Sequence, residues 1–247
     1  MKRIVIVGAT SAIAEACARL WVQKEPANLL LLGRNLEKLE RIAADLRVRS
    51  PESVIETMQA EFLDSSVIQK TVNTIVAQNK VDIVLIAHGY LPLQQECQKD
   101  LAIFEEAINI NALSPAFYAE AFAQYFETIG KGKIVIIGSV AGDRGRKTNY
   151  VYGASKGLLD RLAQGMQHRF AGTDIKVILV KPGPTDTPMT KEYKQRGMKM
   201  ASAEEVAKEM VESIENNRPV IYAPKKWQLI MFIVKHMPAF IFNRLNI

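Results

Sequence analysis

The stretch Ile4-Val5-Ile6-Val7-Gly8-Ala9-Thr10-Ser11-Ala12-Ile13-Ala14 joins a short apolar run to a glycine turn and then to a helical pattern. Four large apolar residues in a row are typical of a β-strand that is covered on both faces. Apolar side chains at helical spacing continue as far as Val22. A strand, a tight turn and a helix in this order indicate the start of a parallel α/β sheet.

The rest of the chain repeats this alternation of strands and helices. We expect further strands at residues 28–32, 54–58, 81–87, 133–137, 175–180 and 220–222, and helices at residues 36–46, 66–79, 100–128, 151–170 and 203–215. The predicted fold is α/β, with a single Rossmann-type, doubly wound parallel sheet that carries helices on both faces. In such a sheet the ligand binds beyond the carboxyl ends of the strands.

Length and composition favour one domain. The 247 residues are 48% hydrophobic, and no Gly/Ser-rich or Pro-rich linker divides them. We expect residues 1–224 to form a dinucleotide-binding and catalytic domain, and residues 225–247 to form a basic, apolar tail that packs on it. No apolar run reaches the roughly 18 residues that a membrane-spanning helix needs, so a cytoplasmic protein is expected.

Charge and cysteine content argue against several classes of protein. The net charge of +6 owes much to residues 225–247, which hold four cations and no acid. Nucleic-acid binding favours a broader basic face, so no nucleic-acid partner is expected. Cys17 and Cys97 lie far apart in the sequence, and we interpret them as idle thiols in a reducing compartment, with no disulfide and no metal site.

A tyrosine and a lysine four residues apart indicate acid–base chemistry. In Tyr152-Gly153-Ala154-Ser155-Lys156 the two side chains share one face of a helix. A neighbouring ammonium favours the phenolate form of a tyrosine, so Tyr152 can protonate an alkoxide as it forms, or take the proton of an alcohol in reverse. Ser139 follows the strand at residues 133–137 and can hydrogen-bond the reacting carbonyl.

The glycine turn is a weak signal by itself. N–H groups at the start of a helix can bind a cofactor pyrophosphate. Such turns usually carry three glycines, however, and here Ala12 and Ala14 follow Gly8 in their place. An ordinary strand-to-helix turn is an equal interpretation of this segment alone, and the motif around Tyr152 favours the cofactor.

Taken together, these motifs resemble the short-chain dehydrogenase/reductase family over essentially the whole chain. The resemblance implies hydride transfer between a nicotinamide cofactor and a carbonyl carbon. It implies that Ser139 orients the carbonyl, that Tyr152 is the general acid/base, and that Lys156 tunes Tyr152 and holds the nicotinamide ribose. Asn111, in Asn111-Ala112-Leu113-Ser114, matches the helix asparagine that supports the proton relay; a polar residue on a solvated helix face is the alternative.

The same resemblance extends to the cofactor site. Pro182-Gly183-Pro184-Thr185-Asp186-Thr187-Pro188-Met189 matches the family's PGxxxTxM stretch, in which Thr187 would hold the carboxamide and Pro182-Gly183 would pass beside the nicotinamide. The residues expected at the cofactor are Gly8, Thr10, Ser11, Ala12, Ile13, Arg34, Asp64, Ala87, Gly89, Tyr152, Lys156, Pro182, Gly183, Thr185 and Thr187.

Two departures from the family pattern concern this site. The family's NNAG segment is Ile86-Ala87-His88-Gly89 here, so its asparagine contacts are missing. The resemblance implies an acid that reads the adenine, and this residue would be Glu61 or Asp64. His88 can touch the cofactor or the substrate, although a structural histidine at a strand end is the favoured interpretation.

Arg34 bears on the choice of cofactor. The strand at residues 28–32 ends in Gly33-Arg34, where an NAD enzyme usually places an acid on the ribose 2′-hydroxyl. A guanidinium there can bind a 2′-phosphate, so we expect NADPH, with NADH less favoured. A solvated charge at the start of the next helix is the alternative.

Within the family, two stretches resemble a reductase of a ketosugar carried on decaprenyl phosphate. One is the segment at residues 143–153, in which Arg144, Arg146 and Lys147 flank the catalytic turn and can meet a phosphate. The other is the C-terminal run at residues 223–247. This resemblance implies a lipid-linked ketone as the substrate and a partner oxidase, whereas a small-molecule ketone remains open.

The tail at residues 225–247 combines large apolar side chains with lysine and arginine. It can lie in a membrane interface, broken by Pro238 into two short helical pieces. An oligomer interface or a lid over the substrate is an equal alternative, and the family resemblance implies a homo-oligomer. As rival functions we keep a general carbonyl or 3-oxoacyl reductase and a non-catalytic, cofactor-binding sensor or partner subunit.

Overall fold

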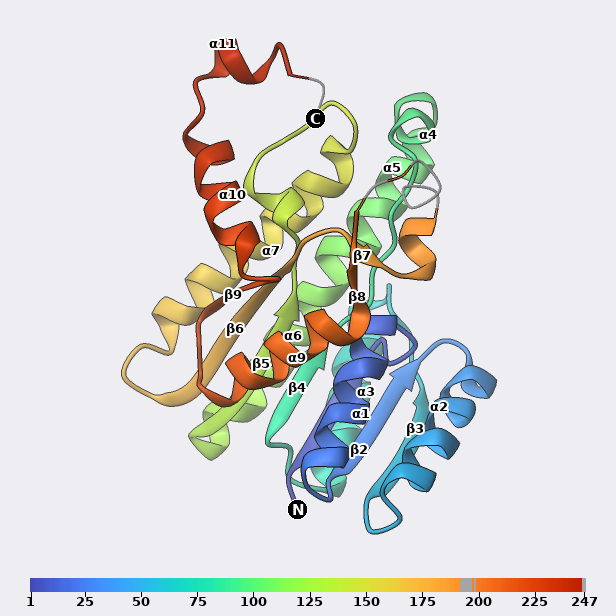
Figure 1. Ribbon diagram of the computed structural model, residues 1–247. Helices are drawn as coiled ribbons and strands as arrows, with labels where there is room; N and C mark the ends of the chain where they lie inside the picture. The colour runs from blue at the N-terminus through green and yellow to red at the C-terminus, as the bar shows by residue number, and fades with distance from the viewer. Residues whose placement is uncertain (192–196, 198, 246–247) are drawn as a thin grey trace.

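A computed structural model describes residues 1–191, 197 and 199–245. Seven parallel strands form one sheet in the order β3-β2-β1-β4-β5-β6-β9, which confirms the predicted Rossmann-type fold (Figure 1). The strand order reverses between β1 and β4, the point at which doubly wound sheets bind their ligands. The strands are β1 (Arg3–Val7), β2 (Asn28–Gly33), β3 (Val54–Gln59), β4 (Ile83–Ile86), β5 (Lys131–Ile137), β6 (Asp174–Pro182) and β9 (Val220–Ala223).

Helices cover both faces of the sheet because every central strand buries both sets of its alternating side chains. In β1, Ile4 and Ile6 pack in one core, whereas Val5 and Val7 pack in the other. The first core is covered by α1 (Ala12–Lys24), α2 (Leu36–Arg49) and α9 (Ala203–Glu215). The second is covered by α3 (Ser65–Gln78), α6 (Ser114–Ile129) and α7 (Tyr150–Arg169). Cys17 and Cys97 are buried, unpaired thiols in separate clusters.

The long helix expected at residues 100–128 is confirmed as one continuous helical stretch, with a π-helical turn in its middle. After α4 (Gln94–Lys99), this stretch consists of α5 (Leu101–Ile108), the π-helical turn η1 (Asn109–Leu113) and α6. The Asn111 amide donates to the carbonyls of Ala107 and Tyr90, at 3.0 and 2.8 Å, and accepts from the Tyr90 N–H at 2.8 Å. Contacts with a distant loop thus accompany a local widening of the helix, which apolar periodicity alone does not reveal.

Shorter elements gather at the carboxyl ends of the strands. They are the 3₁₀ turns η2 (Val140–Asp143) and η3 (Pro188–Thr190), the two-stranded sheet of β7 (Thr185–Asp186) and β8 (Ala201–Ser202), and the tail helices α10 (Lys226–His236) and α11 (Ala239–Phe242). Pro238 separates α10 from α11, as expected. Met231 and Val234 of α10 pack on Val140, so the tail touches the η2 turn. Residues 246–247, the end of the predicted tail, lie outside the described residues.

No helix within the described residues has the length and apolar character needed to cross a membrane.

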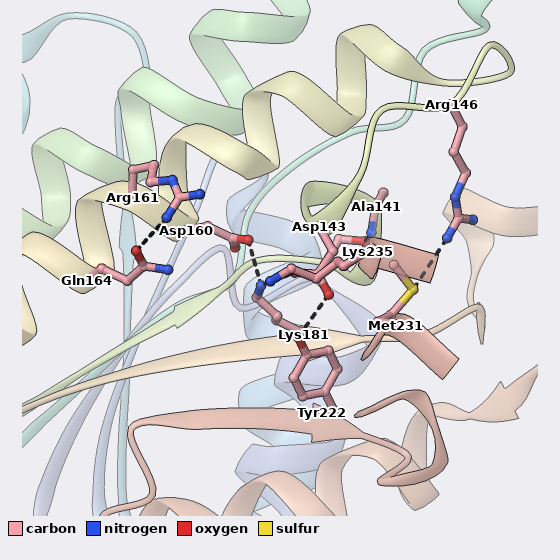
Figure 2. Close-up of polar contacts among 11 residues, drawn as sticks. Ala141, Asp143, Arg146, Asp160, Arg161, Gln164, Lys181, Tyr222, Met231 and Lys235 are labelled. Atoms are coloured by element: carbon pink, nitrogen blue, oxygen red, sulfur yellow. Dashed lines mark hydrogen bonds and ion pairs between the residues drawn. The ribbon is translucent and has the colours of Figure 1, made fainter. Parts of the chain in front are cut away.

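A buried ion cluster fastens the elements at this edge. Lys181, at the end of β6, lies between Asp143 of η2 and Asp160 of α7, with 2.6 Å to the latter (Figure 2). The Tyr222 hydroxyl of β9 donates to Asp143 at 2.8 Å. Burial raises the pKa of Asp160, although the Lys181 ammonium opposes that shift. One cation therefore links β6, η2 and α7.

Candidate active site

A cavity of about 670 Å³ opens at the carboxyl ends of the strands. Segments that directly follow β1, β2, β4, β5 and β6 all contribute to its wall, as a doubly wound sheet requires. The predicted site residues that line it are Gly8, Thr10, Ser11, Ala12, Ile13, Arg34, Ala87, Gly89, Ser139, Tyr152, Lys156, Pro182, Gly183, Thr185 and Thr187.

Helix α7 places Tyr152 and Lys156 one turn apart in the wall of the cavity. The Lys156 Nζ lies 5.8 Å from the centre of the Tyr152 ring and donates to the Ile137 carbonyl at 3.1 Å. Lys156 is only 3% exposed. Burial lowers the pKa of Lys156 to about 8, although the nearby Asp160 carboxylate opposes the shift. This ammonium is therefore poised to lose its proton just above neutral pH.

Two glycines let the η2 turn pack directly on α7. A Cβ on Gly142 would lie 2.8 Å from the Lys156 backbone, and a Cβ on Gly153 would lie 2.9 Å from the Ala141 carbonyl oxygen. Ser139 caps η2, where its Oγ accepts from the Ala141 N–H at 3.1 Å. The close approach brings Ser139 into the same cavity wall as Tyr152 and Lys156.

Asn111 lies behind that wall and not in it. Its side chain is fully buried, and its amide is bonded to the Tyr90 backbone and to Ala107. A Cβ on Gly89 would lie 2.8 Å from the Asn111 Oδ1 and 3.6 Å from the Lys156 Nζ. Asn111 thus supports the loop after β4 beside Lys156, and the solvated-face alternative is wrong.

The glycine turn has the geometry that the sequence indicates. Gly8 has φ of 83°, and a Cβ there would lie 2.6 Å from the His88 backbone nitrogen. Only glycine suits that combination of left-handed backbone and close approach. Ala12 lines the cavity at the start of α1, whereas Ala14 is fully buried in the core. The Ala14 methyl therefore fills core space and not cofactor space.

The residues expected near the adenine and its ribose divide into two groups. Arg34 is exposed at the cavity and forms no ion pair with any described carboxylate. Asp64, in contrast, does not line the cavity: it caps α3 and accepts from the N–H groups of Ser66 and Val67. The structure thus places Asp64 at the start of α3, outside the residues that line the cavity. Glu61 is the acid in the wall, together with Phe62 and Leu63.

His88 is buried among aromatic side chains and also lines the cavity. Its ring packs against Phe62 and Tyr118, and its Nε2 lies 2.8 Å from the Ser114 Oγ. Burial lowers the pKa of His88 to about 3, with Lys156 and Arg34 adding to the shift. The neutral ring is a structural group that also forms part of the cavity wall.

The wall on the β6 side involves the C-terminal tail. Thr185 donates to the Gly183 carbonyl at 2.9 Å, and the Thr187 and Thr190 hydroxyls are 3.3 Å apart. A Cβ on Gly183 would lie 2.0 Å from the Trp227 Nε1, so the Trp227 indole of α10 packs directly against this loop. That contact links the tail to the Pro182-Gly183 segment, and sequence motifs gave no sign of it.

Several wall residues lie outside the expected site. Thr148 and Asn149 stand before α7, while Met189 and Met200 enter from the segments after β6. Arg146 also lines the cavity, whereas the sequence alone does not separate it from Arg144 and Lys147 as a cation that can meet a phosphate. No spacing pattern marks these positions, because they come from irregular segments placed by tertiary contacts.

Comparisons with known proteins agree with this geometry. The sequence profile of the short chain dehydrogenase family matches residues 2–197. An uncharacterized oxidoreductase of Streptomyces coelicolor is 27% identical over 99% of this chain and 96% of its own length. Among solved structures, a short-chain dehydrogenase from Sphingobium yanoikuyae in complex with NADPH has a TM-score of 0.80 and 22% identity, with 97% of each chain covered. A short-chain dehydrogenase from Burkholderia cenocepacia in complex with NADP has a TM-score of 0.83 and 15% identity, with 100% of each chain covered.

The family profile covers most of the chain, including the glycine turn, Ser139 and the Tyr152–Lys156 pair, and the structural likeness extends over the whole fold. The chain therefore belongs to the short chain dehydrogenase family of oxidoreductases.

Proposed function

We propose that this protein is an NADPH-dependent reductase that transfers a hydride to a ketone. The observation that carries the proposal is the buried Lys156 ammonium one helical turn from Tyr152, in a cavity that also holds Ser139 and the glycine turn. A binding module without turnover has no need for an acid, its tuning cation and a carbonyl-binding hydroxyl in one wall. The sensor function is therefore the weaker candidate.

The residues present fit a nicotinamide dinucleotide. Gly8 lines the cavity at the turn, and the first turn of α1 has N–H groups without intrahelical acceptors. Arg34 is placed to bind a 2′-phosphate. Thr185 and Thr187 lie with Pro182 and Gly183 at the opposite end of the cavity. Bound there, the cofactor supplies the hydride.

Side chains of the protein supply the proton and the hydrogen bond that polarises the ketone. In the proposed reaction, the Ser139 hydroxyl donates a hydrogen bond to the ketone oxygen, and the Tyr152 Oη gives that oxygen a proton as negative charge develops on it. The Lys156 ammonium stabilises the phenolate that Tyr152 becomes. Asn111 acts indirectly, because it holds the Gly89–Tyr90 loop beside Lys156.

For the substrate, we propose a ketosugar carried on a polyprenyl phosphate. The support is the resemblance of the catalytic segment and tail to such a reductase, together with the exposed apolar side chains of α10 and α11 and the exposed Lys226 and Lys235 of α10. A soluble ketone or a 3-oxoacyl thioester remains the alternative substrate. We include in the proposal a partner oxidase that supplies the ketosugar, and assembly as a homo-oligomer.

Replacing Tyr152 tests the acid. Tyr152→Phe should lower kcat for ketone reduction by about 10²–10⁴-fold, because general acid catalysis is lost, while NADPH still binds. Tyr150→Phe is the matched control, since Tyr150 is exposed on the same helix and, among the described residues, its hydroxyl accepts a hydrogen bond only from Gln98, at 3.3 Å. Steady-state rates and cofactor fluorescence measure the two effects. Near-normal turnover by Tyr152→Phe would show that another group gives the proton.

The lowered pKa of Lys156 predicts the pH dependence of the reaction. Lys156 is charged below about pH 8 and neutral above it, so kcat/KM for reduction should fall as the pH rises through 8. Lys156→Arg keeps its charge above pH 12 and should remove this step from the profile, whatever its absolute rate. A wild-type profile that stays flat to pH 10, or the same step in the arginine variant, contradicts the assignment.

Arg34 should set the cofactor preference. We expect the ratio of kcat/KM for NADPH to that for NADH to exceed 1 and to fall about 10–100-fold in Arg34→Ala, the range for a charge-assisted contact. Arg41→Ala is the control, because Arg41 is exposed on α2 and pairs with Glu37 away from the cavity. A wild-type preference for NADH, or an unchanged ratio in Arg34→Ala, refutes this role.

The outer face of the tail should bind anionic membranes. Leu229, Phe232 and Phe240 are 67%, 61% and 67% exposed, and each can contribute about 1.5–3 kcal/mol when buried in an interface. We expect wild-type protein to co-sediment with anionic liposomes at low salt, and the triple serine variant of these residues to stay in the supernatant. A Val48→Ser/Leu101→Ser variant is the control, since both side chains are about as exposed, at 81% and 80%.

Wild-type protein that never sediments removes the membrane role. A smaller mass by light scattering for the triple variant would instead show that the same face joins two copies of the chain.

A further inference from the structure

The three cations that flank the catalytic turn have different surroundings. Arg144 bonds the carbonyls of Val234 and Met237, and its guanidinium lies 3.8 Å from the centre of the Phe242 ring. Lys147 is exposed and does not line the cavity. Arg146 alone of the three is part of the cavity wall. Arg144 thus anchors the tail, and Arg146 belongs to the wall of the cavity.

The guanidinium of Arg146 lacks an anionic partner. It forms no ion pair with a carboxylate in the described part of the chain, and its Nη2 meets only the Met231 sulfur, at 3.5 Å, which is a weak acceptor (Figure 2). Its Nε is buried without a hydrogen-bond partner. Asp143 is already bonded to Lys181 and Tyr222. A partly buried cation without an anion is unfavourable unless a ligand supplies one.

The burial of Arg146 also favours an anionic ligand at this residue. Burial lowers the pKa of Arg146, and the more distant Asp143 carboxylate only partly opposes the shift. An unpaired guanidinium in the wall of a cavity matches a ligand that carries an oxyanion.

This end of the cavity is separate from the cofactor phosphates. Arg34 follows β2, whereas Arg146 belongs to the segment between β5 and α7, and β1 and β4 lie between those two strands. Three strand spacings separate β2 from β5, or about 14 Å. Arg34 is therefore the residue placed for a cofactor phosphate, and Arg146 lies on the side of Tyr152.

We infer that Arg146 binds an oxyanion of the substrate, so that the ketone reduced here carries a phosphate or a similar acid group. This inference rests on the proposed reductase function and assigns the residue that holds the acid group of its substrate. A planar guanidinium can bind two oxygens of such a group at once. Holding the charged end of the ketone at Arg146 would fix the distance between its carbonyl and Tyr152.

Matched ketones test the role of Arg146 in turnover. For the wild-type protein, kcat/KM should be higher for ribulose 5-phosphate than for ribulose, and Arg146→Met should reduce that ratio about 10–100-fold. Arg146→Lys, which keeps the charge but not the paired donors, should recover part of it. Lys147→Met is the control for bulk charge and should keep the wild-type ratio. If Arg146→Met lowers both rates equally, Arg146 is structural and the inference is overturned.

Binding without turnover separates this inference from the proposed reaction. Calorimetry on protein saturated with NADP⁺ should show tighter binding of ribulose 5-phosphate than of ribulose, and Arg146→Met should abolish the difference. Failure of reduction with this binding intact would refute only the reductase; equal binding of the two sugars would overturn the anion site. Geranyl phosphate and inorganic phosphate complete the set: stronger competition by geranyl phosphate identifies a lipid-borne phosphate, and equal competition identifies a free one.

Discussion

The arrangement at the carboxyl edge of the sheet depends on the buried ammonium of Lys181. It is 4% exposed and meets carboxylates from η2 and α7, while Tyr222 of β9 binds one of them. Desolvation offsets much of the attraction in such a cluster, so its net stabilisation is small. Loss of one partner, in contrast, strongly destabilises the fold, because the buried charge that is left without a partner costs about 3–5 kcal/mol. The cluster therefore acts mainly by fixing which elements meet and where.

The same cluster also determines the surroundings of Lys156 on helix α7. Asp160 of the cluster lies one turn beyond Lys156, and its carboxylate opposes the fall in the Lys156 pKa that burial causes. Asp143 is the last residue of η2, the turn that directly follows Ser139. Gly142 of the same turn packs on the Lys156 backbone. One ion cluster thus sets the position of η2 against α7 and also the electrostatic surroundings of Lys156. Structure and acid–base chemistry share the same buried charges.

Much of the fold could be predicted, because it follows from periodicity. Apolar runs marked all seven strands, and the glycine turn and the Tyr152–Lys156 spacing marked the edge at which the cavity opens. Features that arise from contacts between distant segments were not predictable in this way. The π-helical turn depends on Asn111 bonding to Tyr90, and an aspartate at a helix start, Asp64, looks the same in sequence whether it caps the helix or reads a cofactor.

The tail shows why its alternative roles are compatible. The inner side of α10 presents Trp227 to Gly183 and Met231 to Arg146, so it forms part of the support for the substrate side of the cavity. The outer side leaves Leu229 and Phe232 exposed. A single helix with both properties places whatever binds its outer face within one helix diameter, about 10 Å, of the cavity wall. The side of α10 that supports the cavity wall through Trp227 and Met231 and the side that leaves apolar side chains exposed therefore belong to the same helix.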